Sequence, residues 1–473
     1  MKIMKIILPL YFLGLVMLSI SCRQNVPTFI NGNLTNISDT SITIEIGKDP
    51  ITGLEPSEYP KVHKLSKDGT FSIPIETSFP VQAVLYSENF VFFSRVLLLH
   101  SGEITLNADC SDIPNTLKYS GAGASLNAFY YDLEKYEAVV SKELSKNAGT
   151  ISLYEKSLDS IQAIMLTMLN DFQNEEPLSN DELLWLSSKI KYGKYYDLMN
   201  RAFQLDLEIT DSGSQIFQTL NLEDHNASMI SRTYNELILR YILHEVNSMG
   251  LNYSDYSDNS EYFRGFFEII NEKLDGKVRD VALTILISDM LKNYNDLAEQ
   301  YYRYYLVECK SADMVEKTTD LYQKYSNIVN QPLSENVNII ATNQQKPFEV
   351  LTQFRNKVIL MDFWASWCSP CIKGFPLTRK LAEDYENQSV EVLYIGNNDQ
   401  KSSLINAIKE YQLYGDHIIL NEEESDIWRG EFEIRGIPTY ILIDQEGKIV
   451  KMDNPHKITD ETYLLIDSLL LAL

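Results

Sequence analysis

The sequence predicts three domains in succession: an all-β domain, an all-α domain, and a C-terminal α/β domain with a mixed central sheet. Its 473 residues are enough for about three domains. Up to about residue 115, apolar and polar residues alternate between turn signals. From there to about residue 330 the chain is rich in tyrosine, poor in glycine and helical in its periodicity. Beyond Gln331-Pro332, strand and helix patterns alternate, which is typical of an α/β fold.

The N-terminus carries a targeting signal. Two lysines precede an apolar run from Ile6 to Ile20, which is shorter than the ~20 residues that a spanning helix needs. The run ends in Ser21-Cys22 and resembles a bacterial lipoprotein signal, although Ile20 departs from the tightest pattern. We therefore expect residues 1–21 to be a signal peptide and Cys22 to be lipidated. An ordinary secretion signal and an uncleaved anchor are the alternatives.

Residues 22–118 are expected to form the β-rich domain. Ser41–Ile46 alternates with period two, and Val91–Leu99 is a denser apolar strand. Lys67-Asp68-Gly69-Thr70 is a turn signal, which predicts a hairpin that continues into the strand starting at Phe71.

Residues 119–332 are expected to form the helical domain, after a boundary at Gly121–Ala124. One apolar stripe recurs at spacings of three and four, which indicates a helix with one buried face. Its members are Ile151, Tyr154, Leu158, Ile161, Met165, Met168 and Phe172. We expect a core-facing helix of a small bundle; a coiled-coil seam is the alternative. The methionines are interpreted as core residues.

Residues 336–473 are expected to form the α/β domain, with helices on both faces of a mixed sheet. The predicted strands are Val358–Phe363, Val390–Ile395, His417–Leu420, Thr439–Ile443 and Lys448–Met452, and the predicted helical segments are Cys371–Tyr385, Ser402–Tyr411, Ser425–Phe432 and Thr459–Leu471.

The chemistry is expected where the first of these strands meets its helix, in Trp367-Cys368-Ser369-Pro370-Cys371. Two cysteines at this spacing indicate thiol–disulfide exchange, since a helix N-terminus lowers the pKa of the first thiol. Cys368 is then the attacking thiolate and Cys371 the resolving thiol. Half of a zinc site would need a second Cys or His pair, which is missing from the sequence. We therefore expect no metal and no cofactor.

Together these residues resemble the thioredoxin superfamily, and specifically its TlpA/ResA-like envelope branch. The resemblance covers about residues 340–473 and rests on the strand–WCxxC–helix unit, on Pro376, and on Gly436-Ile437-Pro438-Thr439. The β-rich domain likewise resembles the module that precedes such a domain in many bacterial envelope lipoproteins.

The resemblance implies roles for single residues. Pro438 is expected to be a cis proline beside the cysteines, and the exposed backbone of Ile437 is expected to pair with an extended substrate. Asp362, six residues before Cys368, is expected to take the proton from Cys371; a structural, protonated carboxyl is the alternative.

Three further positions complete the predicted site. Pro370 is expected to restrict the turn between the cysteines, where Ser369 also lies, and Trp367 to cover it. Several cytochrome-maturation members have a glutamate where this chain has Gly374. That departure argues against a function specific to cytochrome c maturation. It also favours Asp362 as the base.

The sequence therefore predicts a membrane-tethered reductase of disulfide-containing envelope proteins, supplied with electrons by a membrane donor. Strong oxidases and isomerases carry a histidine between the cysteines, where this chain has Ser-Pro. The net charge of −25 argues against nucleic acid and anionic membrane surfaces as partners. A surface-binding protein with an accessory redox domain and a disulfide isomerase are the alternatives. Cys110 and Cys309 are either two separate thiols or a structural bridge.

Overall fold

The computed structural model describes residues 28–471, except 55, 57–58, 76–80, 99–101, 148–150, 205–216, 218, 254–258, 344 and 454–457. It divides into two compact units. Among the described residues, the first unit lies within 28–45 and 60–130, and the second within 46–59 and 131–471. The connection between the second and third strands thus belongs with the helices of the second unit.

The described residues of the first unit form two four-stranded sheets, with strand orders β4-β1-β7-β8 and β3-β2-β5-β6. Burial alternates along most strands, as expected where one face of a sheet covers a core. The strands are β1 (Thr28–Thr35), β2 (Ser41–Ile46), β3 (Lys61–Lys64), β4 (Thr70–Ile75), β5 (Val81–Ser87), β6 (Phe93–Leu98), β7 (Glu103–Asp109) and β8 (Lys118–Gly121), with a short helix α1 (Ile113–Thr116).

The predicted hairpin at Lys67–Thr70 is correct as a turn and wrong as a strand pairing. The turn is closed by Gly69 N, which donates to Ser66 O at 2.9 Å. However, β3 pairs with β2, whereas β4 pairs with β1 in the other sheet. Local turn chemistry fixes the bend, but it does not fix which sheet β4 joins.

Helices form the larger part of the second unit up to residue 330. They are α2 (Ala124–Asn147), which begins in the first unit, α3 (Ile151–Glu175), α4 (Asn180–Gln204), α6 (His225–Ile230), α7 (Arg232–Ser248), α8 (Ser260–Lys273), α9 (Gly276–Lys292), α10 (Ala298–Glu308) and α11 (Ala312–Asn330). The predicted stripe lies on α3, which packs against α4. Near its end the buried residue is Leu169, while Met168 is only half-buried, because 3.6 residues per turn shift the stripe.

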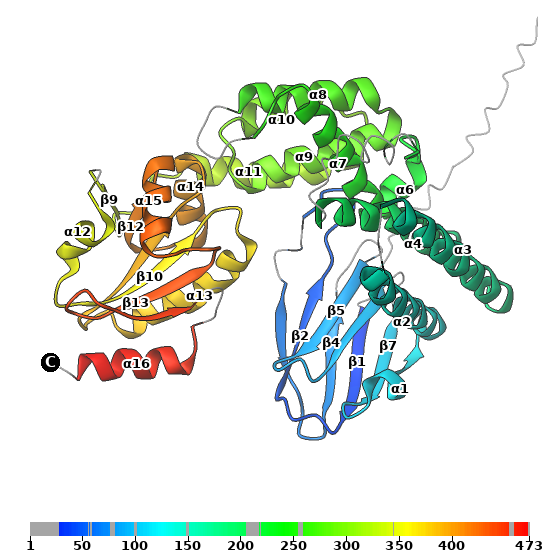
Figure 1. Cartoon of the computed structure of the whole chain (residues 1–473), viewed down its shortest axis with the longest axis horizontal. Coiled ribbons are helices and arrows are strands. Elements are labelled where there is room, and N and C mark those ends of the chain that lie inside the picture. The colour runs from blue at the N-terminus through cyan, green and yellow to red at the C-terminus, as the bar shows by residue number, and fades with distance from the viewer. Residues whose placement is uncertain are drawn as a thin grey trace, which may run out of the picture. The chain divides into compact units, whose positions relative to one another are not determined.

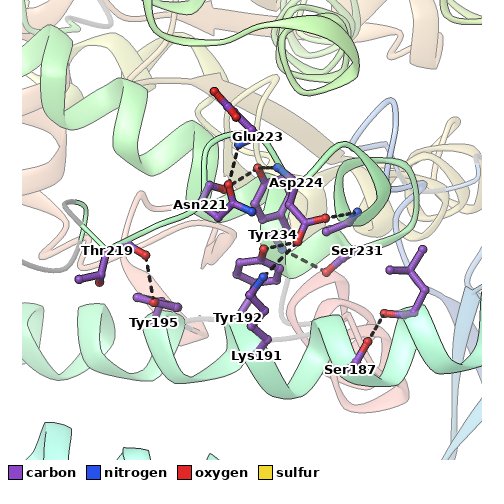
Figure 2. Close-up of polar contacts among 12 residues, drawn as sticks. Ser187, Lys191, Tyr192, Tyr195, Thr219, Asn221, Glu223, Asp224, Ser231 and Tyr234 are labelled. Carbon is purple, nitrogen blue, oxygen red and sulfur yellow. Dashed lines mark hydrogen bonds and ion pairs between the residues drawn. The ribbon is translucent and has the colours of Figure 1, made fainter.

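A polar network joins α4 to the start of α6 (Figure 2). The hydroxyl of Tyr192 donates to Asp224 Oδ2 at 2.5 Å, and Lys191 Nζ lies 3.2 Å from the same oxygen. The other oxygen of Asp224 accepts from Ala227 N at 3.0 Å and so caps α6. One carboxylate therefore fixes a helix terminus and a neighbouring helix together.

Loss of the Tyr192 hydroxyl is expected to weaken this junction. Tyr192 is buried and donates to a charged acceptor, so Tyr192→Phe should cost about 1–3 kcal/mol of local stability. Tyr195→Phe is the matched control, because the Tyr195 hydroxyl makes a longer bond of 3.3 Å to Thr219 O at the surface (Figure 2). Hydrogen exchange of the α6 amides measures the effect. Equal loss of protection in both variants would contradict the role of Asp224.

The α/β part contains one six-stranded mixed sheet, of order β14-β13-β10-β11-β12-β9, in its described residues. Its strands are β9 (Val337–Ile340), β10 (Val358–Trp364), β11 (Val390–Gly396), β12 (Gly415–Ile419), β13 (Thr439–Ile443) and β14 (Ile449–Asp453). The helices are α12 (Pro347–Leu351), η1 (Thr352–Phe354), α13 (Ser369–Asp384), α14 (Lys401–Tyr411), α15 (Glu422–Glu431) and α16 (Asp460–Leu470). The predicted fold class, with all-β, helical and α/β parts, is confirmed; β9 and α12 were not predicted.

Side chains of β10 alternate between two apolar cores. Leu360 and Trp364 belong to the core shared with α13, α14 and α16, whereas Met361 and Phe363 belong to the core shared with α12 and α15. Helices therefore cover both faces of the sheet (Figure 1). Since Asp362 lies in phase with Leu360 and Trp364, it faces the side that α13 covers.

Within the second unit, the helices are joined to the α/β part by direct hydrogen bonds. The buried hydroxyl of Ser403 in α14 donates to Tyr294 O, just after α9, at 3.1 Å. Lys409 Nζ donates to Val329 O in the last turn of α11 at 3.2 Å, and Lys324 pairs with Glu410.

Candidate active site

Cys368 and Cys371 lie where β10 passes into α13. Cys368 is the N-cap residue of α13, and its Sγ accepts from Cys371 N at 3.2 Å. A disulfide bond joins the two residues, whose Cα atoms are 5.3 Å apart. When this bond is reduced, the first turn of α13 presents backbone N–H groups and the positive end of its dipole to Cys368 Sγ. That environment favours a thiolate on Cys368.

The two cysteines are buried, but the residue before them is not. Cys368 is 3% exposed and Cys371 is fully buried, whereas Trp367 is 46% exposed. Ser369 is half-buried, and Pro370 is exposed in the first turn of α13. Residues 366–370, with the exposed Trp367 and Pro370, form the rim of the active site around Cys368.

The loop after β11 holds the rim in place. Trp367 Nε1 donates to Asn398 O at 2.9 Å, and Ser366 N donates to Asp399 Oδ2 at 2.6 Å. The sequence reasoning missed both residues of this loop. A signal was present, because polar residues directly follow the buried strand β11, which runs parallel to β10 and ends at the same edge.

The Gly-Ile-Pro-Thr turn reaches the same edge from β13. Thr439 pairs with Phe363 of β10, so the turn lies beside the end of the strand that leads to the cysteines. The peptide bond between Ile437 and Pro438 is cis, Pro438 is buried, and Ile437 is half-buried. Thr439 Oγ1 donates to Gly436 O at 2.6 Å and closes the turn.

Asp362 is fully buried on β10. Neither carboxylate oxygen has a hydrogen-bond partner among the described residues. Burial raises the pKa of Asp362 to about 8, because the apolar surroundings disfavour the charged form. Tyr394 and Tyr440 pair with Asp362 from the two neighbouring strands, so three polar side chains form a row across the sheet.

Tyr440 also explains the glycine at position 374. A Cβ atom built on Gly374 would overlap the hydroxyl of Tyr440. The tyrosine hydroxyl therefore occupies the space that a side chain on this turn of α13 would need. Burial first, and the charge of Asp362 second, raise the pKa of Tyr440, so this hydroxyl stays protonated.

Gly374→Ala is expected to destabilise the α/β part by about 1–3 kcal/mol, because the added methyl group must displace a packed tyrosine. Gly430→Ala in α15 is the matched control, since a Cβ there meets no atom within 4 Å. It should leave stability unchanged or raise it by up to about 1 kcal/mol through helix propensity. Denaturant unfolding of both variants measures the difference. A Gly374→Ala protein as stable as wild type would show that Tyr440 yields without cost.

The remaining cysteines lie elsewhere. Cys110 is half-buried, Cys309 is buried, and both are free. The lipidation candidate Cys22 lies outside the described residues. Among the helices that the structure describes, none is long and apolar enough to cross a membrane.

Comparison with known proteins identifies the α/β part. The thioredoxin-like family profile matches residues 356–449. The thiol-disulfide oxidoreductase ResA of Bacillus subtilis is 28% identical over 102 residues, which are 22% of this chain and 55% of the relative. ResA of Bacillus cereus is 26% identical over 114 residues, 24% of this chain and 64% of the relative. The chain thus spans 55–64% of the length of these two curated relatives.

Among the solved structures that this chain resembles is the thioredoxin domain of a thiol-disulfide oxidoreductase from Bacteroides vulgatus. It is 26% identical in sequence, and the match covers 25% of this chain and 84% of the other, with a TM-score of 0.24. The profile match ends beyond the cis-proline turn and begins just before β10, so it includes both cysteines and Asp362. The C-terminal part of the chain is a thioredoxin-like domain related to the ResA thiol–disulfide oxidoreductases.

Proposed function

We propose that the chain is a thiol–disulfide oxidoreductase that reduces disulfide bonds in proteins of the cell envelope. The supporting observation is the Cys368–Cys371 pair in the first turn of α13, next to the exposed Trp367 and preceded on β10 by the buried Asp362. No other bonded cysteine pair occurs in the part of the chain that the structure describes.

The first step is attack by the Cys368 thiolate on one sulfur of the client disulfide. The client S–S bond breaks, a mixed disulfide forms with Cys368, and the second client sulfur leaves as a thiolate. The helix N-terminus supports this step by favouring the thiolate form of Cys368 over the thiol.

In the second step, Cys371 loses its proton and attacks Cys368 Sγ. The mixed disulfide breaks, the first client sulfur leaves as a thiolate, and the Cys368–Cys371 disulfide forms. The client has then gained two electrons, which the dithiol has lost. Asp362 is the proposed proton acceptor in its carboxylate form, which is the minority form at pH 7 because burial raises its pKa to about 8. That pKa is close to the ordinary value of a thiol, about 8.5, so transfer of the Cys371 proton to the carboxylate costs little.

Net reduction requires a reduced membrane partner that returns two electrons to the Cys368–Cys371 disulfide. The Ser-Pro dipeptide between the cysteines predicts a reduction potential of about −220 to −280 mV, in the thioredoxin range. Equilibration of the full chain with glutathione or dithiothreitol buffers, followed by thiol alkylation, measures this value. A potential above about −150 mV would make the chain an oxidase and contradict the proposed direction.

The proposed tether is a lipid on Cys22, which would hold the mature chain at a membrane facing the envelope. Mass spectrometry of the mature N-terminus, together with Cys22→Ser, tests this. We expect acyl chains on the wild type and none on the variant. An unmodified wild-type chain that retains residues 1–21 would replace the lipid tether with an uncleaved anchor, while leaving the redox proposal unaffected.

A further inference from the structure

A cavity of about 580 Å³ lies beside the active-site rim, and all of its lining residues belong to the second unit. Four separate stretches of chain form its walls. They are the 48–54 segment between β2 and β3, the helices α7 to α9, the rim residues Ser366 and Trp367, and Asp399 with Ser403 after β11. A single cavity therefore connects the helices to the residue that precedes Cys368.

The 48–54 segment is fixed in its position as a wall. Asp49 Oδ1 accepts from Ile51 N at 2.7 Å, while its Oδ2 pairs with Lys317 Nζ of α11 at 3.0 Å. Asn235 of α7 is buried and donates to Pro50 O at 2.7 Å. These bonds hold the segment against α7 and α11, so the cavity is formed before any ligand arrives, which lowers the cost of binding.

Exposed apolar side chains gather in this cavity. Leu243 of α7 is 36% exposed, Tyr253 is 45% exposed, and Trp367 is 46% exposed. Such side chains on a concave wall mark a place where a partner buries apolar surface.

The charged residues of the lining do not favour either sign of ligand. Arg232 Nε pairs with Glu236 Oε1 at 2.7 Å within α7, and Asp49 is paired with Lys317. Other lining side chains, among them Arg240 and Asp289, add charges of both signs. The cavity therefore has no excess of one charge that would attract an oppositely charged ligand. Its exposed apolar side chains are the feature that a ligand can recognise.

We propose that this cavity binds an apolar or aromatic side chain of the client protein, located a few residues from the client cysteine that Cys368 attacks. The inference rests on the proposed function and adds a substrate class to it. Attack requires the client sulfur at Cys368, and each residue of an extended client spans only about 3.3–3.6 Å. Residues on the Trp367 side of the client cysteine can then reach the cavity, whereas a free small molecule would gain nothing from this adjacency.

The test compares two cyclic disulfide peptides that differ only beside one cysteine, where the first carries Phe and Leu and the second carries two serines. The full chain, reduced with dithiothreitol and freed of it, is mixed with each peptide in single-turnover experiments. The peptide disulfide becomes two thiols as the chain forms its Cys368–Cys371 disulfide. Wild type should reduce the apolar peptide at least about tenfold faster, since burial of a leucine-sized group is worth this much.

Leu243→Asp should bring the ratio of the two rate constants close to one. Leu306→Asp is the matched control, because Leu306 is also an exposed helical leucine, at 45%, but lies on α10 outside the cavity lining. It should keep the wild-type ratio. If Leu243→Asp shows no cooperative thermal unfolding, the variant is not folded. Tyr253→Ser then repeats the test at another lining residue of the same cavity.

The outcomes separate this inference from the proposed function. Equal rates for both peptides with wild type, or an unchanged ratio in Leu243→Asp and Tyr253→Ser, overturn the client site while disulfide reduction stands. Failure of wild type to reduce either peptide or a small aromatic disulfide overturns the proposed function itself. If Leu243→Asp instead converts a dimer to a monomer in sedimentation experiments, a second copy of the chain fills the cavity and the proposal is wrong.

Discussion

Cys371→Ser is expected to stop turnover at the mixed disulfide, so that the client stays bound to Cys368. Cys371 is fully buried in α13, and in the oxidised state its sulfur is bonded to Cys368. Resolution is thus intramolecular, and a thiol from solution lacks the high effective molarity of a neighbouring group. We expect multiple-turnover reduction to fall by at least about a thousandfold. Non-reducing gels and mass spectrometry of the trapped adduct check this result.

Two cysteine variants provide the controls for this trap. Cys368→Ser should form no adduct, because it lacks the attacking sulfur. Cys110→Ser removes a free and half-buried thiol. The double variant Cys110→Ser/Cys371→Ser should therefore form the same adduct as the single variant Cys371→Ser. If the double variant formed no adduct, the client would be bonded to Cys110 and not to Cys368.

Asp362→Asn should separate the two chemical steps. Attack by Cys368 on the client should keep nearly its wild-type rate, while resolution by Cys371 should slow by one to two orders of magnitude, about 1.4–2.8 kcal/mol of barrier. Single-turnover kinetics of the mixed disulfide measure both steps. Slower attack with normal resolution would mean that Asp362 serves Cys368, and that Cys371 loses its proton by another route.

The same substitution should stabilise the oxidised protein at neutral pH. The pKa of Asp362 is about 8 in the folded chain and near 3.8 when exposed, so the folded state binds the extra proton between these values. The free energy of unfolding is therefore not reduced by this group below about pH 4. It falls as the pH rises from about 4 to about 8, because the unfolded chain loses this proton first. At pH 7, Asp362→Asn should therefore gain roughly 2–4 kcal/mol, and the gain should shrink as the pH falls.

Denaturant unfolding at pH 5 and pH 7 measures this gain. Asp426→Asn in α15 is the matched control, because Asp426 is exposed in the same domain and should change stability little at either pH. A gain from Asp362→Asn that does not depend on pH would mean that its carboxyl group is not protonated in the folded chain.

The sequence was informative where one short stretch of chain carries the signal. Three short stretches each predict their own structure: the apolar run of β10, the cysteine spacing and the Gly-Ile-Pro-Thr turn. Together they predict the α/β domain. Its edge strand β9 was missed, because four residues, Val337–Ile340, give too short an alternation to count. The pairing of β4 was misassigned for a related reason, since a turn signal does not report which sheet receives the strand.

The cavity was beyond sequence reasoning for a different reason. Its walls come from segments that are far apart in sequence, and no local pattern marks the approach of Pro50 to Asn235. Asp399 could have been noticed from its place after β11, but its bond to Ser366 N depends on the meeting of two parallel strands. Such long-range contacts follow from the assembled fold, so they appear only in the structure.

The assignment of residues 46–59 to the second unit has a consequence for the order of folding. Pro50 meets Asn235 across 185 positions, and Asp49 meets Lys317 across 268. At a synthesis rate of about 5–20 residues per second, the segment emerges roughly 10 s or more before its first partner helix. The strands that flank it can pair during this interval, whereas the segment must wait. For the same reason, a fragment that begins after residue 130 would contain both cysteines and the helices and would still lack one wall of the cavity.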